Sequence, residues 1–74
     1  MSINIESLME KISIIRRKKG ITQEELATHI DKSVKFIGDL ETGRRNPSIQ
    51  TFIDICLTLE IDMNELFYGG DKYE

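Results

Sequence analysis

The residues best suited to recognition chemistry lie between positions 33 and 39. Ser33 offers a hydroxyl group, Val34 an apolar surface, Lys35 an ammonium donor and Asp39 a carboxylate acceptor. In the major groove of DNA, an ammonium group can donate to guanine O6 and N7, and a carboxylate can accept from cytosine N4. An apolar side chain can pack on a thymine methyl group. These four residues are therefore candidates for contacts with base edges.

Patterns typical of catalysis or metal binding are absent from the sequence. It contains no glycine-rich phosphate loop, no cluster of His, Cys and acidic ligands, and no nucleophile paired with a base. The one histidine, His29, is interpreted as a surface residue, and the one cysteine, Cys56, as a packed thiol. We therefore expect no enzyme activity, no cofactor, no metal ion and no small-molecule substrate.

Length and charge predict one small domain with a basic central region. The 74 residues fit a single domain over residues 1–68, followed by a flexible tail at 69–74. The net charge is −3, yet residues 11–45 contain nine Lys and Arg against five Asp and Glu. Residues 46–74 contain one Lys against six acidic residues. One face of the domain can therefore meet phosphate groups although the whole chain is acidic.

Apolar periodicity and capping residues predict five short helices. The first is expected to begin at Ser7, which forms a capping-box pattern with Glu10, and Asn4 is the alternative cap. It should end in a cationic segment followed by Gly20, because glycine readily adopts the left-handed conformation that stops a helix. The predicted helices cover residues 7–19, 23–30, 34–41, 48–59 and 63–68.

The second and third predicted helices are joined by a short turn, as a helix-turn-helix requires. Thr22 caps the second helix with Glu25 as its capping-box partner, and Ser33 caps the third. The start and outer side of the third helix carry the four candidate base-contacting residues and would enter the major groove. The apolar residues expected to pack inward are Leu26, Ala27, Ile30, Ile37 and Leu40.

The fourth predicted helix carries a broad apolar stripe. With about 100° of rotation per residue, the residues expected in one narrow arc are Ile49, Phe52, Ile53, Cys56 and Leu59. Ile55 and Leu57 widen this arc on both sides. The stripe is broader than packing within one domain needs, which predicts surplus apolar surface.

Residues of one recurring pattern are spread over most of the chain. They are Ile15-Arg16, Gly20 to Ala27, Ser33, Ile37, Leu40-Glu41, Gly43, Asn46-Pro47-Ser48 and the segment 59–67. With these residues the sequence resembles the Xre/Cro/phage-repressor type of helix-turn-helix domain. The resemblance implies an all-α, lambda-repressor-like fold of five short helices, with the helix-turn-helix formed by the second and third.

The resemblance also implies roles for individual residues. Gln23 matches a glutamine that binds phosphate and supports the third helix. Arg16 and Glu41 match a partly buried salt bridge between the first helix and the end of the third. Arg44 and Arg45, in the turn after the third helix, match a position where the family meets the DNA backbone. Lys32 and Lys35 lie where they can add to this contact, although the resemblance itself does not assign them. The residues expected at phosphate groups are Thr22, Gln23, Lys32, Arg44 and Arg45.

The chain departs from the usual pattern of this family in three respects. Val34 and Asp39 are less usual at base-contacting positions than Gln, Asn or Arg. Glu60 stands where relatives usually have glycine, which predicts a non-glycine residue in the left-handed conformation. Gly38 stands inside the third helix, where relatives often have a polar residue. The absence of a side chain at Gly38 would allow the close approach of a backbone, either of protein or of DNA.

These patterns predict a sequence-specific DNA-binding regulator of transcription, a repressor or controller that binds a pseudo-palindromic operator as a homodimer. Double-stranded DNA is the expected partner, in the cytoplasm and away from membranes. A domain of this size buries little core, so we expect a dimer interface formed by Leu57, Met63, Phe67 and Tyr68. The alternative is a protein-binding module, such as an antitoxin or adaptor, which the acidic net charge and the unusual Val34 and Asp39 favour.

Overall fold

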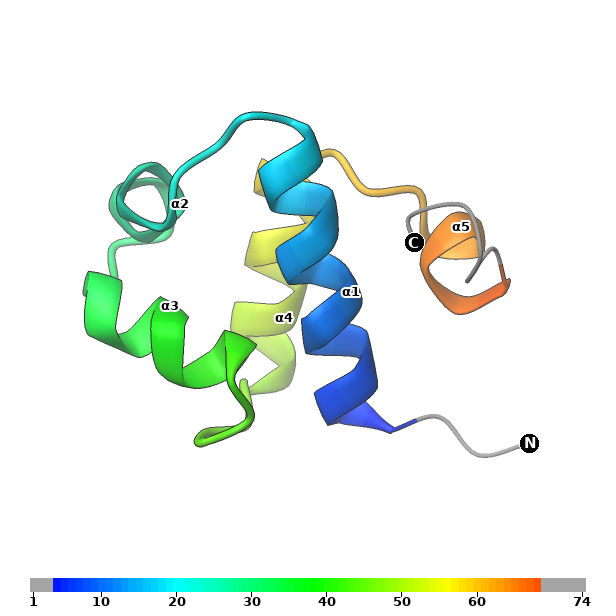
Figure 1. The fold of residues 1–74 in the computed structure, drawn as a ribbon, viewed down its shortest axis with the longest axis horizontal. Helices are drawn as coiled ribbons and strands as arrows, with labels where there is room; N and C mark the ends of the chain where they lie inside the picture. The colour runs from blue at the N-terminus through cyan, green and yellow to red at the C-terminus, as the bar shows by residue number, and fades with distance from the viewer. Residues whose placement is uncertain (1–3, 69–74) are drawn as a thin grey trace.

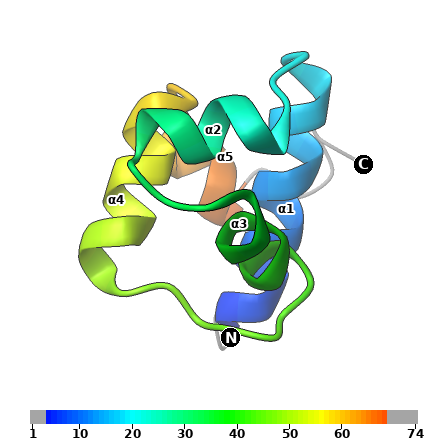
Figure 2. The same cartoon turned by 90° about the vertical axis from the view of Figure 1, so that its left-hand side faces the viewer.

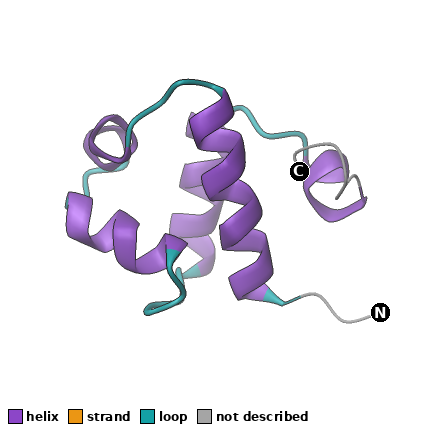
Figure 3. Cartoon of the chain, viewed as in Figure 1, coloured by secondary structure: helices purple, strands orange, loops and turns teal. Residues whose placement is uncertain are grey.

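The computed structural model describes residues 4–68, which form five α-helices and no strand (Figure 1). The helices are α1 (Ile5–Lys18), α2 (Gln23–His29), α3 (Val34–Glu41), α4 (Ile49–Thr58) and α5 (Met63–Tyr68). Figure 3 shows that short loops join them. The predicted all-α fold of five short helices is confirmed, and the predicted tail at 69–74 lies outside the described residues.

The five helices surround one core. In Figure 1, α1 and α4 occupy the centre, with α2 and α3 on one side and α5 on the other. Figure 2 shows α1 and α4 on opposite flanks, with α3 nearest the viewer. Helix α2 packs on α3 and α4, and α1 packs on α3 and α5. Helix α3 is thereby held against the body of the domain by two partners.

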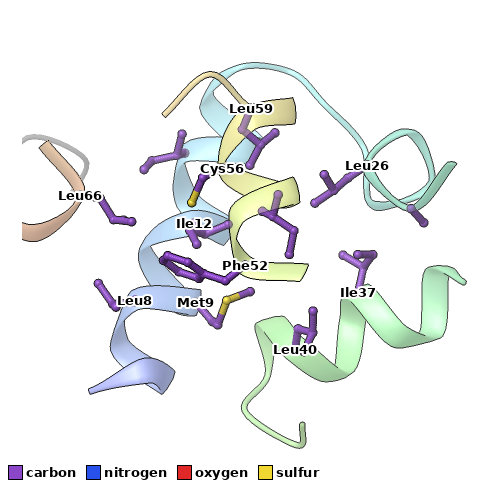
Figure 4. Packing of buried hydrophobic residues seen from close by; sticks show 13 residues of the cluster. Leu8, Met9, Ile12, Leu26, Ile37, Leu40, Phe52, Cys56, Leu59 and Leu66 are labelled. Atoms are coloured by element: carbon purple, nitrogen blue, oxygen red, sulfur yellow. The ribbon is translucent and has the colours of Figure 1, made fainter. Parts of the chain in front are cut away.

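The core draws apolar side chains from every helix (Figure 4). Ile12 of α1, Leu26 of α2, Ile37 of α3, Cys56 of α4 and Leu66 of α5 are all almost fully buried. Full burial of a large apolar side chain contributes about 1.5–3 kcal/mol. Contacts between helices, rather than the stability of any one short helix, therefore hold the domain together.

Helix α1 begins at Ile5, earlier than its capping-box pattern predicted. The side chain of Asn4 accepts hydrogen bonds from the backbone N–H of Glu6 at 2.8 Å and of Ser7 at 3.4 Å. The predicted start at Ser7 is wrong and the alternative cap, Asn4, is the one used. Asn4 satisfies the first free N–H groups, so Ser7 lies within the helix.

Helix α4 buries only part of the broad apolar stripe that the sequence predicts. Ile49 is 76% exposed, and Ile53 and Leu57 are exposed as well, so the stripe leaves apolar surface outside the core, as expected. The buried face contains the predicted stripe residues Phe52, Ile55, Cys56 and Leu59 together with Thr51, which the apolar pattern did not include. Thr51 can be buried because its hydroxyl accepts a hydrogen bond from the hydroxyl of the capping Ser48 at 3.0 Å.

Glu60 adopts the left-handed conformation with φ 54°, as predicted. It follows the end of α4, where the N–H of Ile61 donates to the carbonyl oxygen of Cys56 at 2.9 Å. This bond closes the helix end in the geometry for which glycine is usually selected. Asp31, after α2, has a similar φ of 59°. Both helix ends therefore turn through a residue that carries a side chain.

None of the helices in residues 4–68 has the length and apolar composition needed to cross a bilayer. The longest, α1, contains 14 residues. A membrane-spanning helix needs about 20 residues of mostly apolar character.

Candidate nucleic-acid interface

Helix α2 starts at a complete capping box. The N–H of Glu25 donates to the Thr22 hydroxyl oxygen at 3.0 Å, and the N–H of Thr22 donates to the Glu25 carboxylate at 2.9 Å. The backbone hydrogen bond from Thr22 holds the pKa of Glu25 below its ordinary value. The predicted cap is therefore present, and it fixes the point where the chain enters α2.

A short turn connects α2 to α3. The N–H of Lys32 donates to the carbonyl oxygen of Ala27 at 2.9 Å, and Asp31 supplies the left-handed residue. The Ser33 hydroxyl then accepts from the N–H of Phe36 at 3.0 Å and so begins α3. Helix α3 has the predicted bounds, Val34–Glu41, because both its cap and its stop are local sequence signals.

The outer side of α3 presents the predicted base-contacting residues together. Ser33, Val34 and Lys35 are exposed at its N-terminal end. Asp39 is more enclosed: its carboxylate lies 3.0 Å from the Lys35 ammonium and 3.8 Å from the Arg44 guanidinium. The Asp39 carboxylate is thus already paired with two cations. A base contact by Asp39 would compete with these ion pairs.

In the turn after α3, one carbonyl group accepts two backbone hydrogen bonds. The backbone N–H groups of Arg44 and Arg45 both donate to the carbonyl oxygen of Asp39, at 2.9 and 3.2 Å. Both arginine side chains are exposed beside the outer side of α3. Lys32 is exposed at the other end of the same region. The cations expected at phosphate groups therefore flank the residues expected at bases.

Gln23 supports α3 through an acidic side chain. Its amide nitrogen donates to the Glu41 carboxylate at 2.9 Å, and its side chain is half-buried. This bond ties the start of α2 to the end of α3. The part of the predicted role that concerns support of the third helix has this hydrogen bond as its structural basis.

Arg16 and Glu41 form a bidentate pair. Nε of Arg16 lies 2.7 Å from one carboxylate oxygen and Nη2 lies 3.0 Å from the other. Nη1 of Arg16 donates to the carbonyl oxygen of Ile21 at 2.7 Å. Among the side chains that the structure describes, no buried polar atom lacks a hydrogen-bond partner. The network joins α1, the α1–α2 loop, α2 and α3.

Sequence reasoning did not single out Phe36. This residue is half-buried, packs partly against the core, and has two cations near its ring. The Lys32 ammonium is 5.5 Å and the Arg45 guanidinium 5.1 Å from the centre of its ring. The only sequence signal was the placement of Lys32 four residues before an aromatic residue.

The chain matches the helix-turn-helix family over residues 12–66. It belongs to the Xre/Cro-type helix-turn-helix family. This is a family of DNA-binding transcriptional regulators, and membership agrees with the prediction that the chain is not an enzyme.

Three similar proteins illustrate the range of this family. An HTH-type transcriptional regulator, DdrOP3, of Deinococcus deserti is 32% identical over 66 residues, which are 89% of this chain and 51% of that protein. An uncharacterized HTH-type transcriptional regulator, y4dJ, of Sinorhizobium fredii is 38% identical over 58 residues, 78% of this chain and 75% of that protein. The ImmF control region 10 kDa protein of Bacillus phage phi105 is 33% identical over 51 residues, which are 69% of this chain and 57% of that protein. The chain thus spans about half the length of the Deinococcus protein.

Within this helix-turn-helix domain, the fold does not require glycine at position 38. A Cβ atom built on Gly38 would have no neighbouring atom within 4 Å. Of the two close approaches considered from the sequence, an approach of protein backbone is therefore absent from the described structure. A helix-interior glycine costs about 1 kcal/mol relative to alanine, and no packing contact offsets that cost here.

The surface that the sequence assigned to dimerisation is largely exposed. Leu57 is 70% and Tyr68 83% exposed, and Met63 is exposed to a lesser degree. Phe67 is half-buried and packs against the core, so it offers less free surface than the other three. On α4, the exposed residues at intervals of one turn form a stripe: Ile49, Ile53 and Leu57.

Proposed function

We propose that this helix-turn-helix protein binds a specific pseudo-palindromic DNA sequence as a homodimer and thereby regulates transcription, as a repressor or controller. The observation that carries the proposal is the outer side of α3. Exposed Ser33, Val34 and Lys35 stand at its start, and exposed cations flank them. A helix presented in this way can enter the major groove with its N-terminal residues toward the bases.

In this proposal, the bases are read by few side chains. Lys35 donates to guanine, Val34 packs on a thymine methyl group, and Ser33 accepts or donates a hydrogen bond. Asp39 contributes mainly by holding Lys35, since its carboxylate is 3.0 Å from that ammonium group. Specificity then depends on a short contact set, supplemented by the shape of the DNA.

Phosphate groups are bound by the residues around this helix. Lys32, Arg44 and Arg45 are exposed and carry the charge, while Thr22 and Gln23 lie at the start of α2. Each phosphate that is neutralised releases counterions, so the affinity falls as the salt concentration rises. The local basic character supports this role in spite of the net charge of −3.

The dimer is proposed to form through exposed apolar side chains. Leu57, Met63 and Tyr68 supply most of this surface, and Phe67 supplies a smaller part. Burying them between two copies removes apolar area from water. A two-fold dimer would place two α3 helices about one turn of DNA apart, which matches a pseudo-palindromic site.

The exposed stripe of Ile49, Ile53 and Leu57 on α4 favours the second candidate, a protein-binding module such as an antitoxin or adaptor. An exposed apolar stripe can bind a second copy of the chain or a different protein. The two candidates differ in their response to DNA. Titration with random-sequence duplex DNA at low and high salt is expected to give salt-dependent binding. Absence of binding at low salt would leave the protein-binding module as the better proposal.

The recognised sequence itself can be obtained by selecting bound duplexes from a random pool. Two similar half-sites with inverted orientation are expected for a homodimer. A single half-site, with no partner at a fixed distance, would contradict the dimer while leaving DNA recognition in place.

A further inference from the structure

Phe36 holds two cationic side chains beside its aromatic ring. The Lys32 ammonium and the Arg45 guanidinium lie 5.5 and 5.1 Å from the ring centre. Both distances fall within the range of about 6 Å over which a cation is attracted to the face of an aromatic ring. All three side chains line one surface depression at the start of α3.

The neighbouring cations are held in a different way. Asp39 binds Lys35 at 3.0 Å and lies 3.8 Å from Arg44. A carboxylate orders these cations but also neutralises part of their charge. The ring of Phe36 has no net charge, so it can order its two cations while they keep their full charge for an anion.

Phe36 and the backbone of Arg45 are both held in place by the fold. Phe36 packs partly against the core, and its N–H donates to the Ser33 hydroxyl oxygen at 3.0 Å. The N–H of Arg45 donates to the Asp39 carbonyl oxygen at 3.2 Å, and this bond holds the backbone of Arg45 beside α3. The position of the ring therefore fixes where the two cations are presented.

We infer that Phe36 is a positioning residue for DNA phosphate binding, which orders Lys32 and Arg45 before the DNA arrives. A guanidinium group that stacks on a ring keeps the N–H donors at its edge free for a phosphate. Ordering a long side chain in advance removes part of the entropy loss on binding. This inference rests on the proposed function and deepens it by naming how two of the phosphate contacts are prepared.

The test measures binding to a random-sequence DNA duplex over a series of salt concentrations. Phe36→Leu is expected to weaken binding about three- to tenfold, because the two long side chains are then ordered at the cost of binding instead of beforehand. The salt dependence should keep its slope, because no charge is removed. Phe36→Tyr retains the ring and should bind like the unaltered chain. Arg45→Gln should lower the slope by about 1.

A double-mutant cycle separates positioning from general packing. Once Arg45→Gln is present, Phe36→Leu should have a smaller effect on affinity than it has alone. The matched control is Arg44→Gln, whose side chain lies near Asp39 rather than the ring. In the double variant of Phe36→Leu and Arg44→Gln, the loss of affinity should equal the product of the losses caused by each substitution alone, because the two side chains act independently. Thermal unfolding of every variant identifies the temperatures at which all are folded, and Phe36→Met replaces Phe36→Leu if the latter does not fold.

The outcomes distinguish the inference from the function on which it rests. If the unaltered chain binds with a salt-dependent affinity but Phe36→Tyr is as weak as Phe36→Leu, the inference is overturned alone. The inference is also overturned if the double-mutant cycles give the same coupling in DNA affinity between Phe36 and Arg44 as between Phe36 and Arg45. If the unaltered chain shows no salt-dependent binding at low salt, the proposed function and the inference fail together.

Discussion

Arg16 of α1 and Glu41 at the end of α3 form a nearly enclosed ion pair with side chains that are 7% and 5% exposed. Each of the three guanidinium nitrogens of Arg16 donates to an oxygen, either of the Glu41 carboxylate or of the Ile21 carbonyl group. Glu41 also accepts from Gln23. The pair therefore sets the position of α3, and with it the position of the residues proposed to read bases.

Removing one member of this pair should destabilise the domain strongly. Glu41→Ala leaves the Arg16 charge buried without its partner, and we expect the free energy of unfolding to fall by about 3–5 kcal/mol. Urea denaturation measures this. Arg17→Ala, an exposed neighbour on α1, is the control and should change it by less than about 0.5 kcal/mol. Equal effects of the two substitutions would mean that the ion pair does not hold α3.

How far the sequence predicts the structure depends on whether the signals are local. The bounds of α3 follow from Ser33 at its start and from Gly43 just beyond its end, so they could be read directly. The start of α1 could not, because two cap signals overlapped and Asn4 reaches the first free N–H groups. The burial of Thr51 in α4 was missed because it depends on a hydrogen bond with Ser48 rather than on apolar character.

In the candidate site, too, features with a local sequence signal could be predicted and contacts between separate elements could not. The exposure of Ser33, Val34 and Lys35 follows from the apolar residues on the other side of α3, so periodicity was sufficient. The contact between Phe36 and Arg45 depends on how the chain turns after the helix ends. Such a contact between two elements carries no periodic signal, which is why the sequence did not reveal it.

Gly38→Ala should stabilise the domain. The added Cβ atom meets open space, and alanine favours the helix interior over glycine by about 1 kcal/mol. The free energy of unfolding measured in urea should therefore rise by about that amount. Gly43→Ala is the matched control: Gly43 has φ +82°, which alanine adopts only with strain, so stability should fall. A loss of stability from both substitutions would contradict the open environment of Gly38.

Cys56 should make stability fall at alkaline pH. Burial raises the pKa of its thiol from 9.0 to about 11. Between these values the unfolded chain loses the thiol proton while the folded chain keeps it, so rising pH favours unfolding. The decline should begin near pH 9 and level off above pH 11. Urea denaturation across this range should show a weaker decline for Cys56→Ala. An identical pH profile for both proteins would contradict the prediction.

Oligomeric state tests the exposed apolar surface. We expect the unaltered chain to form dimers in sedimentation equilibrium, and Leu57→Lys to shift it toward monomers, because a charge would be buried in the proposed interface. Gln50→Lys adds the same charge to an exposed polar position of α4 and should leave the dimer intact. A chain that sediments only as a monomer at high micromolar concentration would remove the proposed homodimer.

Lys35 and Arg44 should affect DNA binding in different ways, although both lie near Asp39. Lys35 stands at the start of α3, where side chains reach base edges. Lys35→Ala should therefore reduce discrimination at one base pair by about 1–3 kcal/mol. Arg44 lies in the turn after α3, so Arg44→Ala should weaken binding to all sequences nearly equally and lower the salt slope by about 1. Competition assays on the selected site and its single-base variants distinguish the two patterns. If both substitutions changed base preference to the same degree, the separate assignments to base and phosphate would be wrong.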